Sequence, residues 1–286
     1  TPFELPQPLP AVNDLERLRL QNLNNTATSS VICDLSRLIL FKAMANEPID
    51  RLKCINAAAT LKEIKDHRVS NALFAEAAKR LLNVFGFDIR SVPDFMKVGA
   101  DLGSRFKNRY YVINKVIDID GTHSRRMHEN EQSSEKGILM VVLAFAFCKG
   151  SPSKHKGSHT MRWIAGDQLY DLLHMVDENI PGEPPGERDR RKSGATMAKK
   201  ELDIDSLLEK FVQADYLLKD FFPVNGVDGE ENVMYAMGPR AALEIGRRQL
   251  VYFCAQVLDE DPDPTILAEI EDEFDSQHDS EKEGDD

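Results

Sequence analysis

The chain has few cysteines and no arrangement of them that could hold a metal. Its 286 residues include four, Cys33, Cys54, Cys148 and Cys254, which are far apart and form no Cys-x-x-Cys pair. Structural zinc sites need clustered Cys and His ligands, so the sequence excludes a RING or a zinc ribbon within this chain. We expect reduced thiols of an intracellular protein, with Cys148 and Cys254 buried in apolar helices.

The chain also lacks a hydrophobic run long enough to cross a membrane. The longest apolar run is Ile138–Cys148, within the segment Gly137–Gly150. At about 1.5 Å per residue, such a helix is too short for a bilayer core of about 30 Å. A helix that is apolar on all sides must be buried completely. We therefore predict that this helix is the centre of a packed domain and ends at Gly150.

Common catalytic signatures are absent, with one partial exception. The sequence contains no GxxxxGK[ST], GxSxG or HExxH motif. The string VIDIDGT at residues 116–122 resembles the nucleophile loop of haloacid-dehalogenase-type phosphatases, with Asp118 as nucleophile and Asp120 as acid/base. The string GDQLYD at residues 166–171 matches the acidic loop of those enzymes. However, too few residues separate the two strings for the parallel βα units of that fold, so we expect Asp118 and Asp120 to be linker turn residues and keep the phosphatase as an alternative.

Two histidines make a weak case for a metal. His155 and His159 are four residues apart, and Cys148 is nearby in the sequence. No further ligand has the spacing that a zinc site requires. We therefore expect a basic loop here, and we predict neither a metal nor a cofactor.

Negative charge is confined to the end of the chain. The net charge is -12, but residues 259–286 contain fourteen acidic residues against one lysine, so residues 1–258 have a net charge close to +1. Segments of this composition are usually solvated and disordered. We predict a disordered acidic tail over residues 259–286, which either aids solubility or competes with nucleic acid for a basic surface.

Basic residues gather in two Gly- and Pro-containing loops of the second half. Flexible lysine and arginine side chains can contact phosphates, which gives salt-dependent, sequence-independent affinity for DNA. The alternative is that both loops are merely solvated. The candidate DNA-binding residues are Lys154, Lys156, Arg188, Arg190, Arg191, Lys192, Lys199 and Lys200.

The first half of the chain has the element order of a winged helix. Residues 1–33 are rich in proline and then in Asn, Thr and Ser, which predicts a flexible arm with a short helix over residues 14–23. Apolar periodicity and capping residues predict helices over residues 34–45, 50–61 and 70–85, then strands over 87–92 and 109–116 joined by a long loop. We therefore predict a winged-helix domain over residues 34–117 and a linker over 118–134.

The second half repeats this order. The buried helix is followed by predicted helices over residues 164–178 and from Asp203, strands over 216–224 and 233–237, and a last helix that begins at Pro239. We predict a second winged-helix domain over residues 135–258. The predicted fold class is mainly α with small β-hairpins (α+β), as tandem winged-helix domains.

Five segments, in order, resemble the MAGE homology domain family. They are LSRLILFKAMANEPI (35–49), AEAAKRLLNVFGFD (75–88), YYVINK (110–115), GILMVVLAFAFCKG (137–150) and YAMGPRA (235–241). The match extends from Asp34 to Leu258. Met237 replaces the family's usual tryptophan, Ile39-Leu40 replaces a Leu-Leu pair, and two loops are expanded. These departures are most like the ancestral branch of the family, the non-SMC element three subunits of the SMC-type DNA-repair complex.

The resemblance implies a nuclear, chromosomal subunit without catalytic activity of its own. It implies binding and stimulation of a RING-type ubiquitin ligase subunit through the first winged helix, with the contact at Ile39 and Leu40. The alternative is that one of these two residues belongs to the core. It also implies a grip on the kleisin subunit through the second winged helix, and a share in binding double-stranded DNA. Our candidate kleisin contacts are Leu169, Leu173, Leu250 and Phe253.

A stand-alone winged-helix DNA-binding regulator is the alternative from a different class. Reading of the major groove would require a basic third helix. Residues 70–85 contain only two basic residues, Lys79 and Arg80. The sequence therefore favours contacts from the loops to the DNA backbone.

Overall fold

The computed structural model describes Leu9 and residues 12–22, 25–45, 47–58, 69–97, 100–114, 133–152, 161–184, 203–223 and 231–272. The chain divides into two compact units, which we call the first unit (residues 6–131) and the second unit (residues 132–286). The division falls inside the segment predicted as the linker, which lies outside the described residues except for its last two. Each unit is described by itself.

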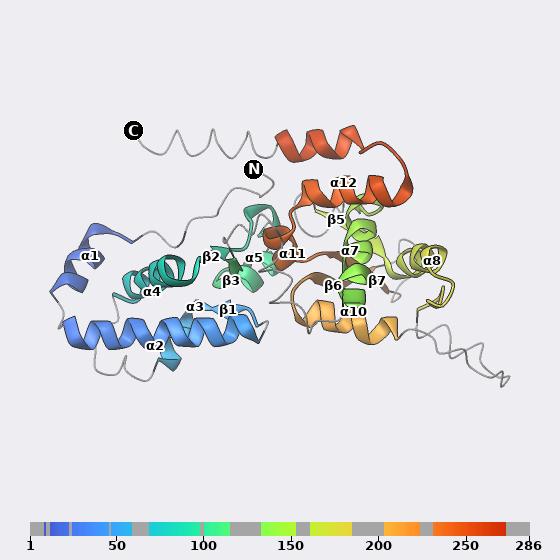
Figure 1. Cartoon of the computed structure of the whole chain (residues 1–286). Helices are drawn as coiled ribbons and strands as arrows, with labels where there is room; N and C mark the ends of the chain where they lie inside the picture. Colours follow the sequence, from blue (N-terminus) through green and yellow to red (C-terminus); the bar gives the residue numbers. More distant parts are fainter. Residues whose placement is uncertain are drawn as a thin grey trace. The chain divides into compact units, whose positions relative to one another are not determined.

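The first unit is a winged helix (Figure 1). Its three-stranded antiparallel sheet has the order β1-β3-β2, and Ser91 of β2 and Ile49 of β1 both pair with Tyr110 of β3. Helices α2 and α4 pack against each other beside this sheet. The elements are α1 Asp14–Gln21, α2 Asn25–Met44, β1 Ile49–Asp50, α3 Arg51–Ala57, α4 Ser70–Phe85, β2 Phe87–Ser91, η3 Asp94–Met96, α5 Ala100–Phe106 and β3 Arg109–Asn114.

Local sequence sets the ends of several of these helices. Asn13 and Glu16 form a capping box at the start of α1, with the Glu16 amide donating to Asn13 Oδ1 at 2.8 Å. Asp50 caps α3 in the same way, accepting from the Lys53 amide at 3.0 Å. Helix α4 ends at Gly86, whose φ of 70° is the left-handed conformation that a C-cap glycine adopts.

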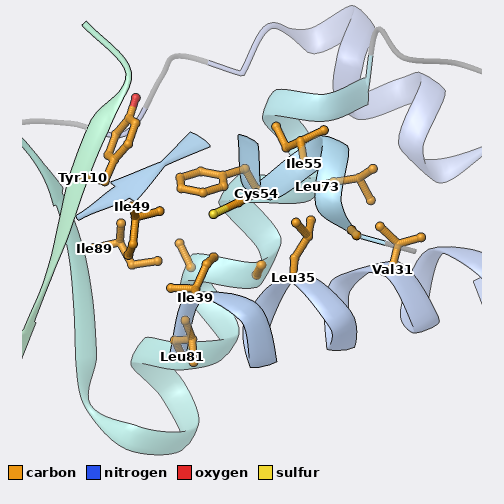
Figure 2. Packing of buried hydrophobic residues seen from close by; sticks show 14 of the residues in the cluster. Val31, Leu35, Ile39, Ile49, Cys54, Ile55, Leu73, Leu81, Ile89 and Tyr110 are labelled. Atoms are coloured by element: carbon orange, nitrogen blue, oxygen red, sulfur yellow. The ribbon is translucent and has the colours of Figure 1, made fainter. Parts of the chain in front are cut away.

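A single apolar cluster joins the helices of the first unit to its sheet. Figure 2 shows Ile39 of α2 beside Leu81 of α4, with Ile49 and Ile89 of the strands nearby. All four side chains are buried. The regular spacing of apolar residues on α2 and α4 therefore forms the core that the sequence predicts.

The second unit repeats the architecture with a four-stranded antiparallel sheet of order β4-β5-β7-β6. Helix α7 is its centre and packs against α8, α12, β5 and β7, and its residues 142–147 are all buried. The elements are α7 Ser133–Cys148, β4 Ser151–Pro152, β5 Arg162–Ala165, α8 Gly166–Val176, α10 Ile204–Gln213, β6 Leu217–Pro223, β7 Glu231–Met237, α11 Pro239–Glu244 and α12 Arg247–Leu258, followed by a helix over residues 264–272.

The Gly-Pro-Arg-Ala segment of the second unit has a clear structural role. A Cβ on Gly238 would lie 2.3 Å from the Asp215 carbonyl oxygen, so only glycine fits there. Pro239 begins α11, where its missing amide hydrogen is not needed. Arg240 is buried, with its guanidinium 5.4 Å from the Tyr216 ring centroid and 3.4 Å from the carboxylate of Glu244. This segment fixes the corner between β7 and the closing helices.

Several predicted boundaries were wrong. Helix α2 begins at Asn25 rather than at residue 34, and its Val31 is buried in the core, so residues 25–33 are the first turns of a packed helix and not a flexible arm. Residues 162–165 form β5 before α8 begins, because β5 pairs with β7. The expected single last helix is divided at Gly246, whose φ is 86°. The predicted loop 93–108 contains η3 and α5.

The predicted acidic tail needs correction for residues 264–272. This segment is helical, and Ile266 and Ile270, one turn apart, are both buried. Asp263 begins the helix by accepting from the Thr265 amide at 2.8 Å. Ion pairs from Glu269 to Arg162 (2.8 Å) and from Glu271 to Arg248 (2.9 Å) hold it to the second unit. The prediction from acidic composition therefore missed a short amphipathic helix within this segment.

Candidate functional site

The two residues predicted to contact a RING partner lie in different environments. Ile39 is fully buried in the core of the first unit. Leu40 is partly exposed and packs against the edge of the same core. Of these two residues, only Leu40 therefore has side-chain surface that a partner could reach.

Helical spacing places two exposed apolar residues on the same side of α2 and α4 as Leu40. The guanidinium of Arg80 donates to Cys33 Sγ at 3.0 Å, which marks where this side of α2 meets α4. Leu40 is seven residues after Cys33, Met44 is four further on, and Val84 is four residues after Arg80. Residues at these helical spacings share a face.

Figure 2 supports this placement because α2 and α4 run in the same direction, with Val31 near Leu73 at one end and Ile39 near Leu81 at the other. The side chains of Met44 and Val84 are 73% and 63% exposed. We call Leu40, Met44 and Val84 the α2–α4 face. It is an apolar surface on the unit for which a protein partner was predicted.

The four predicted kleisin contacts mostly hold the second unit together. Leu169 and Leu173 of α8 and Leu250 of α12 are buried, where both helices pack against α7. Phe253 is partly exposed. Tyr252 and Val257 are exposed apolar residues on the same helix, so α12 has an outer apolar surface that includes Phe253 and extends beyond the predicted residues.

All eight candidate DNA-binding residues lie outside the described residues. Lys154 and Lys156 fall in residues 153–160, and the other six fall in residues 185–202. The first segment connects β4 to β5, and the second segment precedes α10. The predicted DNA contacts therefore stay a prediction.

A groove of about 890 Å³ lies between α8, α10, β6 and β7. It is built from distant segments: a Cβ on Gly166 would lie 3.3 Å from the Val233 carbonyl oxygen, so α8 begins close against β7. The charged and phenolic residues of its lining are Asp167, Tyr170, Asp205, Glu209, Lys210, Lys219, Glu231 and Tyr235.

Electrostatics make the groove a polar site with excess negative charge. The Tyr170 hydroxyl donates to the Asp205 carboxylate, and Lys219 pairs with Glu209. Burial, and then the negative charges of Glu209 and Asp205, raise the pKa of Tyr235 to about 12. Its phenol is therefore a hydrogen-bond donor at neutral pH. The arrangement suits a polar or basic segment of a polypeptide.

The alternative phosphatase reading gains no support from the described residues. Asp118 and Asp120 lie outside them, and the second string forms the start of α8 after a strand of an antiparallel sheet. The strand pairs that the structure describes are all antiparallel, whereas that enzyme fold needs a parallel sheet.

The described residues contain neither a cluster of metal ligands nor a membrane-spanning helix. No three side chains of His, Cys, Asp or Glu come together there as they would around a metal ion. Within the same residues, the helices are too short or too polar to span a bilayer. His155 and His159 fall outside this part of the chain.

Comparison with known proteins gives consistent matches. The model of the MAGE homology domain matches residues 35–248. The chain is 24% identical to human melanoma-associated antigen 10 over 263 residues, covering 91% of this chain and 57% of that protein. It is also 24% identical to the human non-structural maintenance of chromosomes element 3 homolog over 233 residues, covering 81% of this chain and 62% of that protein. The chain thus spans less than two thirds of either relative.

The fold also has a counterpart among solved structures. A chain of an Nse1-Nse3-Nse4 complex superimposes with a TM-score of 0.57 at 19% sequence identity. The match covers 87% of this chain and 99% of that chain. At this identity the likeness concerns the fold.

Proposed function

This chain belongs to the MAGE homology domain family, and from that premise we propose that it is a subunit of an SMC-type chromosome-maintenance and DNA-repair complex, without catalytic activity of its own. The family match over residues 35–248 carries the proposal. Its similarity to non-structural maintenance of chromosomes element 3 homologs, and to the fold of a chain in an Nse1-Nse3-Nse4 complex, supports the choice within the family. Such a subunit acts in the nucleus, on the chromosome.

The first proposed partner is a RING-type ubiquitin ligase subunit, which this chain binds and stimulates. We place the contact on the α2–α4 face, around Leu40. Covering exposed apolar side chains with a partner removes their surface from water, which favours association, and Met44 and Val84 extend the apolar surface beyond Leu40. Ile39 supports this surface from the core.

The second proposed partner is the kleisin subunit of the same complex. Its contact lies on the second unit, on the outer surface of α12, where Phe253 is flanked by the exposed Tyr252 and Val257. Leu169, Leu173 and Leu250 are buried where α8 and α12 pack against α7, so they hold the unit together rather than touching the partner. The groove at the start of α8 is a second place for a polar segment of that chain.

The third proposed activity is weak binding of double-stranded DNA. The eight basic residues of segments 153–160 and 185–202 would contact phosphates, while residues 1–258 have a net charge close to +1. This contribution is independent of base sequence and falls as salt rises.

Co-expression with the RING-type and kleisin subunits of the same organism, followed by size-exclusion chromatography, tests the assignment of partners. We expect Leu40→Glu to abolish co-elution with the RING subunit and leave kleisin binding intact, because a buried unpaired charge costs several kcal/mol at an interface. Val257→Glu is the matched control with the reverse expectation. Both side chains have exposed surface, so circular dichroism should show both variants folded.

Three results would count against the proposal. Loss of both partners in either variant would mean that the two surfaces are not separate. Unchanged binding in Leu40→Glu would remove the α2–α4 face. If the wild-type chain binds neither subunit but binds duplex DNA, it is instead a stand-alone winged-helix DNA-binding regulator.

A further inference from the structure

Two thiols from different helices meet inside the second unit. Cys148 ends α7, Cys254 lies in the middle of α12, and these helices pack against each other. Cys148 Sγ is 3.7 Å from the carbonyl oxygen of Leu250. Leu250 is one turn before Cys254, and side chains of a helix lean toward its N-terminus, so the Cys254 side chain leans toward that same carbonyl. Both side chains therefore approach the same carbonyl, which brings the two thiols together between α7 and α12.

Their surroundings favour one thiolate in the pair. The hydrogen bond from Cys148 lowers the pKa of Cys254 to about 7, with the positive charge of Lys149 acting in the same direction against burial and Glu260. The same hydrogen bond, and then burial, raise the pKa of Cys148, because the donor of the bond must keep its proton. Cys254 is buried and Cys148 is partly exposed, so a small oxidant would reach the Cys254 thiolate from the side of Cys148.

We propose that Cys148 and Cys254 form a redox-active dithiol that peroxide converts to a disulfide joining α7 to α12. The deprotonated sulfur attacks one oxygen of hydrogen peroxide, breaks the O–O bond and becomes a sulfenic acid, while the other oxygen leaves as hydroxide and takes up a proton to form water. The second thiol then attacks this sulfur, and its proton and the departing hydroxyl form a second water. Two thiols are oxidised by two electrons and one peroxide is reduced.

The bond would enclose most of the second unit in one covalent loop. The chain between the two cysteines contains α8, α10, α11 and the strands β4 to β7. Closing so long a loop restricts the unfolded chain far more than the folded unit, which already holds the two sulfurs together. Oxidation therefore stabilises the second unit, and this inference does not depend on the proposed function.

The other two cysteines provide matched controls. Cys33 and Cys54 belong to the first unit, where Cys33 accepts from Arg80 and Cys54 is buried in the core. Their replacement by serine removes competing thiols without touching the pair.

The test treats the folded full-length chain with hydrogen peroxide, blocks free thiols by alkylation and maps the peptides by mass spectrometry. We expect a loss of two hydrogens, about 2 Da, in a peptide pair linked through Cys148 and Cys254, and its reversal by dithiothreitol. Cys33→Ser/Cys54→Ser should keep the link, and its melting temperature should rise on oxidation. Cys148→Ser or Cys254→Ser should abolish the link.

Other outcomes overturn the proposal. Alkylation of both thiols after peroxide treatment, or oxidation of Cys148 to sulfinic acid without a link, means that the sulfurs do not react together. A link that forms only in denaturant means that the folded unit does not promote it. The wild-type map decides this by itself, even if a serine variant fails to fold.

Discussion

Ile39 and Leu40 are neighbours in the sequence but have different roles in the structure. Ile39 packs beside Leu81 in the core, while Leu40 lies at its edge with part of its surface open. A helix rotates by about 100° per residue, so one of two adjacent apolar residues faces inward and the other faces sideways. The pair predicted as one contact therefore separates into a supporting residue and a surface residue.

Alanine at each position should reveal this difference in stability. We expect Ile39→Ala to lower the free energy of unfolding by about 2–4 kcal/mol, because it leaves a cavity in a closed core. Leu40→Ala should cost about 1 kcal/mol, since part of its apolar surface is exposed in the folded unit. Urea unfolding monitored by circular dichroism measures both. Equal costs would contradict the assignment of Ile39 to the core.

Tyr235 gives the second unit an alkaline pH dependence. Its pKa is raised to about 12 in the folded unit by burial and by Glu209 and Asp205, against about 10 in the unfolded chain. Because the folded state holds this proton more tightly, the stabilisation is complete below pH 10 and is lost as the pH rises toward 12, by about 2–3 kcal/mol in all.

Tyr235→Phe removes this titration. Chemical unfolding of wild type and variant at pH 8 and pH 11 should show that the wild type loses more stability between the two pH values. Other tyrosines and the lysines titrate in both proteins and cancel in the comparison. Identical pH profiles would show that Tyr235 does not carry the effect.

At the scale of elements, glycine is favoured at the end of one helix and unfavourable inside another. Gly86 ends α4 with a φ of 70°, where a side chain is strained. Gly137 lies within α7, and a Cβ added there would have no atom within 4 Å. The same substitution should therefore have opposite signs at the two sites.

Gly86→Ala should destabilise the first unit by about 1–2 kcal/mol, the cost of a left-handed alanine. Gly137→Ala should stabilise the second unit by about 0.5–1 kcal/mol, because alanine loses less backbone entropy in a helix. Thermal unfolding of the two variants beside wild type is sufficient. Destabilisation by Gly137→Ala would mean that this turn of α7 is more crowded than the structure indicates.

At the scale of the whole molecule, the acidic segment begins before the folded part of the second unit ends. The acidic segment begins at Asp259, but the second unit continues through the helix over residues 264–272, whose Ile266 and Ile270 are buried. A deletion designed on composition alone would remove part of the core. The appropriate truncation for a test of the acidic segment ends after Asp272.

Duplex binding by the chain truncated after Asp272 tests the role of charge. We expect its affinity to exceed that of the full chain, because acidic residues that repel phosphate are removed, and to fall roughly 10- to 100-fold between about 50 and 200 mM salt. Charge reversal at Arg190, Arg191 and Lys192 should weaken binding further. Fluorescence anisotropy with a labelled duplex measures this, and affinity indifferent to salt would rule out phosphate contacts.

Local sequence determined most of the elements and their order. The capping residues Asn13, Asp50 and Asp203, the glycine after α4 and the apolar spacing of α4 and α7 act within a few residues of one another, so they could be identified without the fold. The five-segment resemblance indicated the family, which the match over residues 35–248 establishes. The short strand β5 was missed because it is stabilised by pairing with β7, about 70 residues later.

Only the tertiary structure decided which apolar residues remain accessible and which distant residues meet. The sequence predicted partner contacts at Leu169, Leu173 and Leu250, but these side chains are buried in the folded unit. Met44 and Val84, which were not predicted as contacts, are exposed. The contact between Cys148 and Cys254 likewise has no local signal. Periodicity records that a helix has an apolar side, but burial depends on what packs against that side, and those partners come from remote parts of the chain.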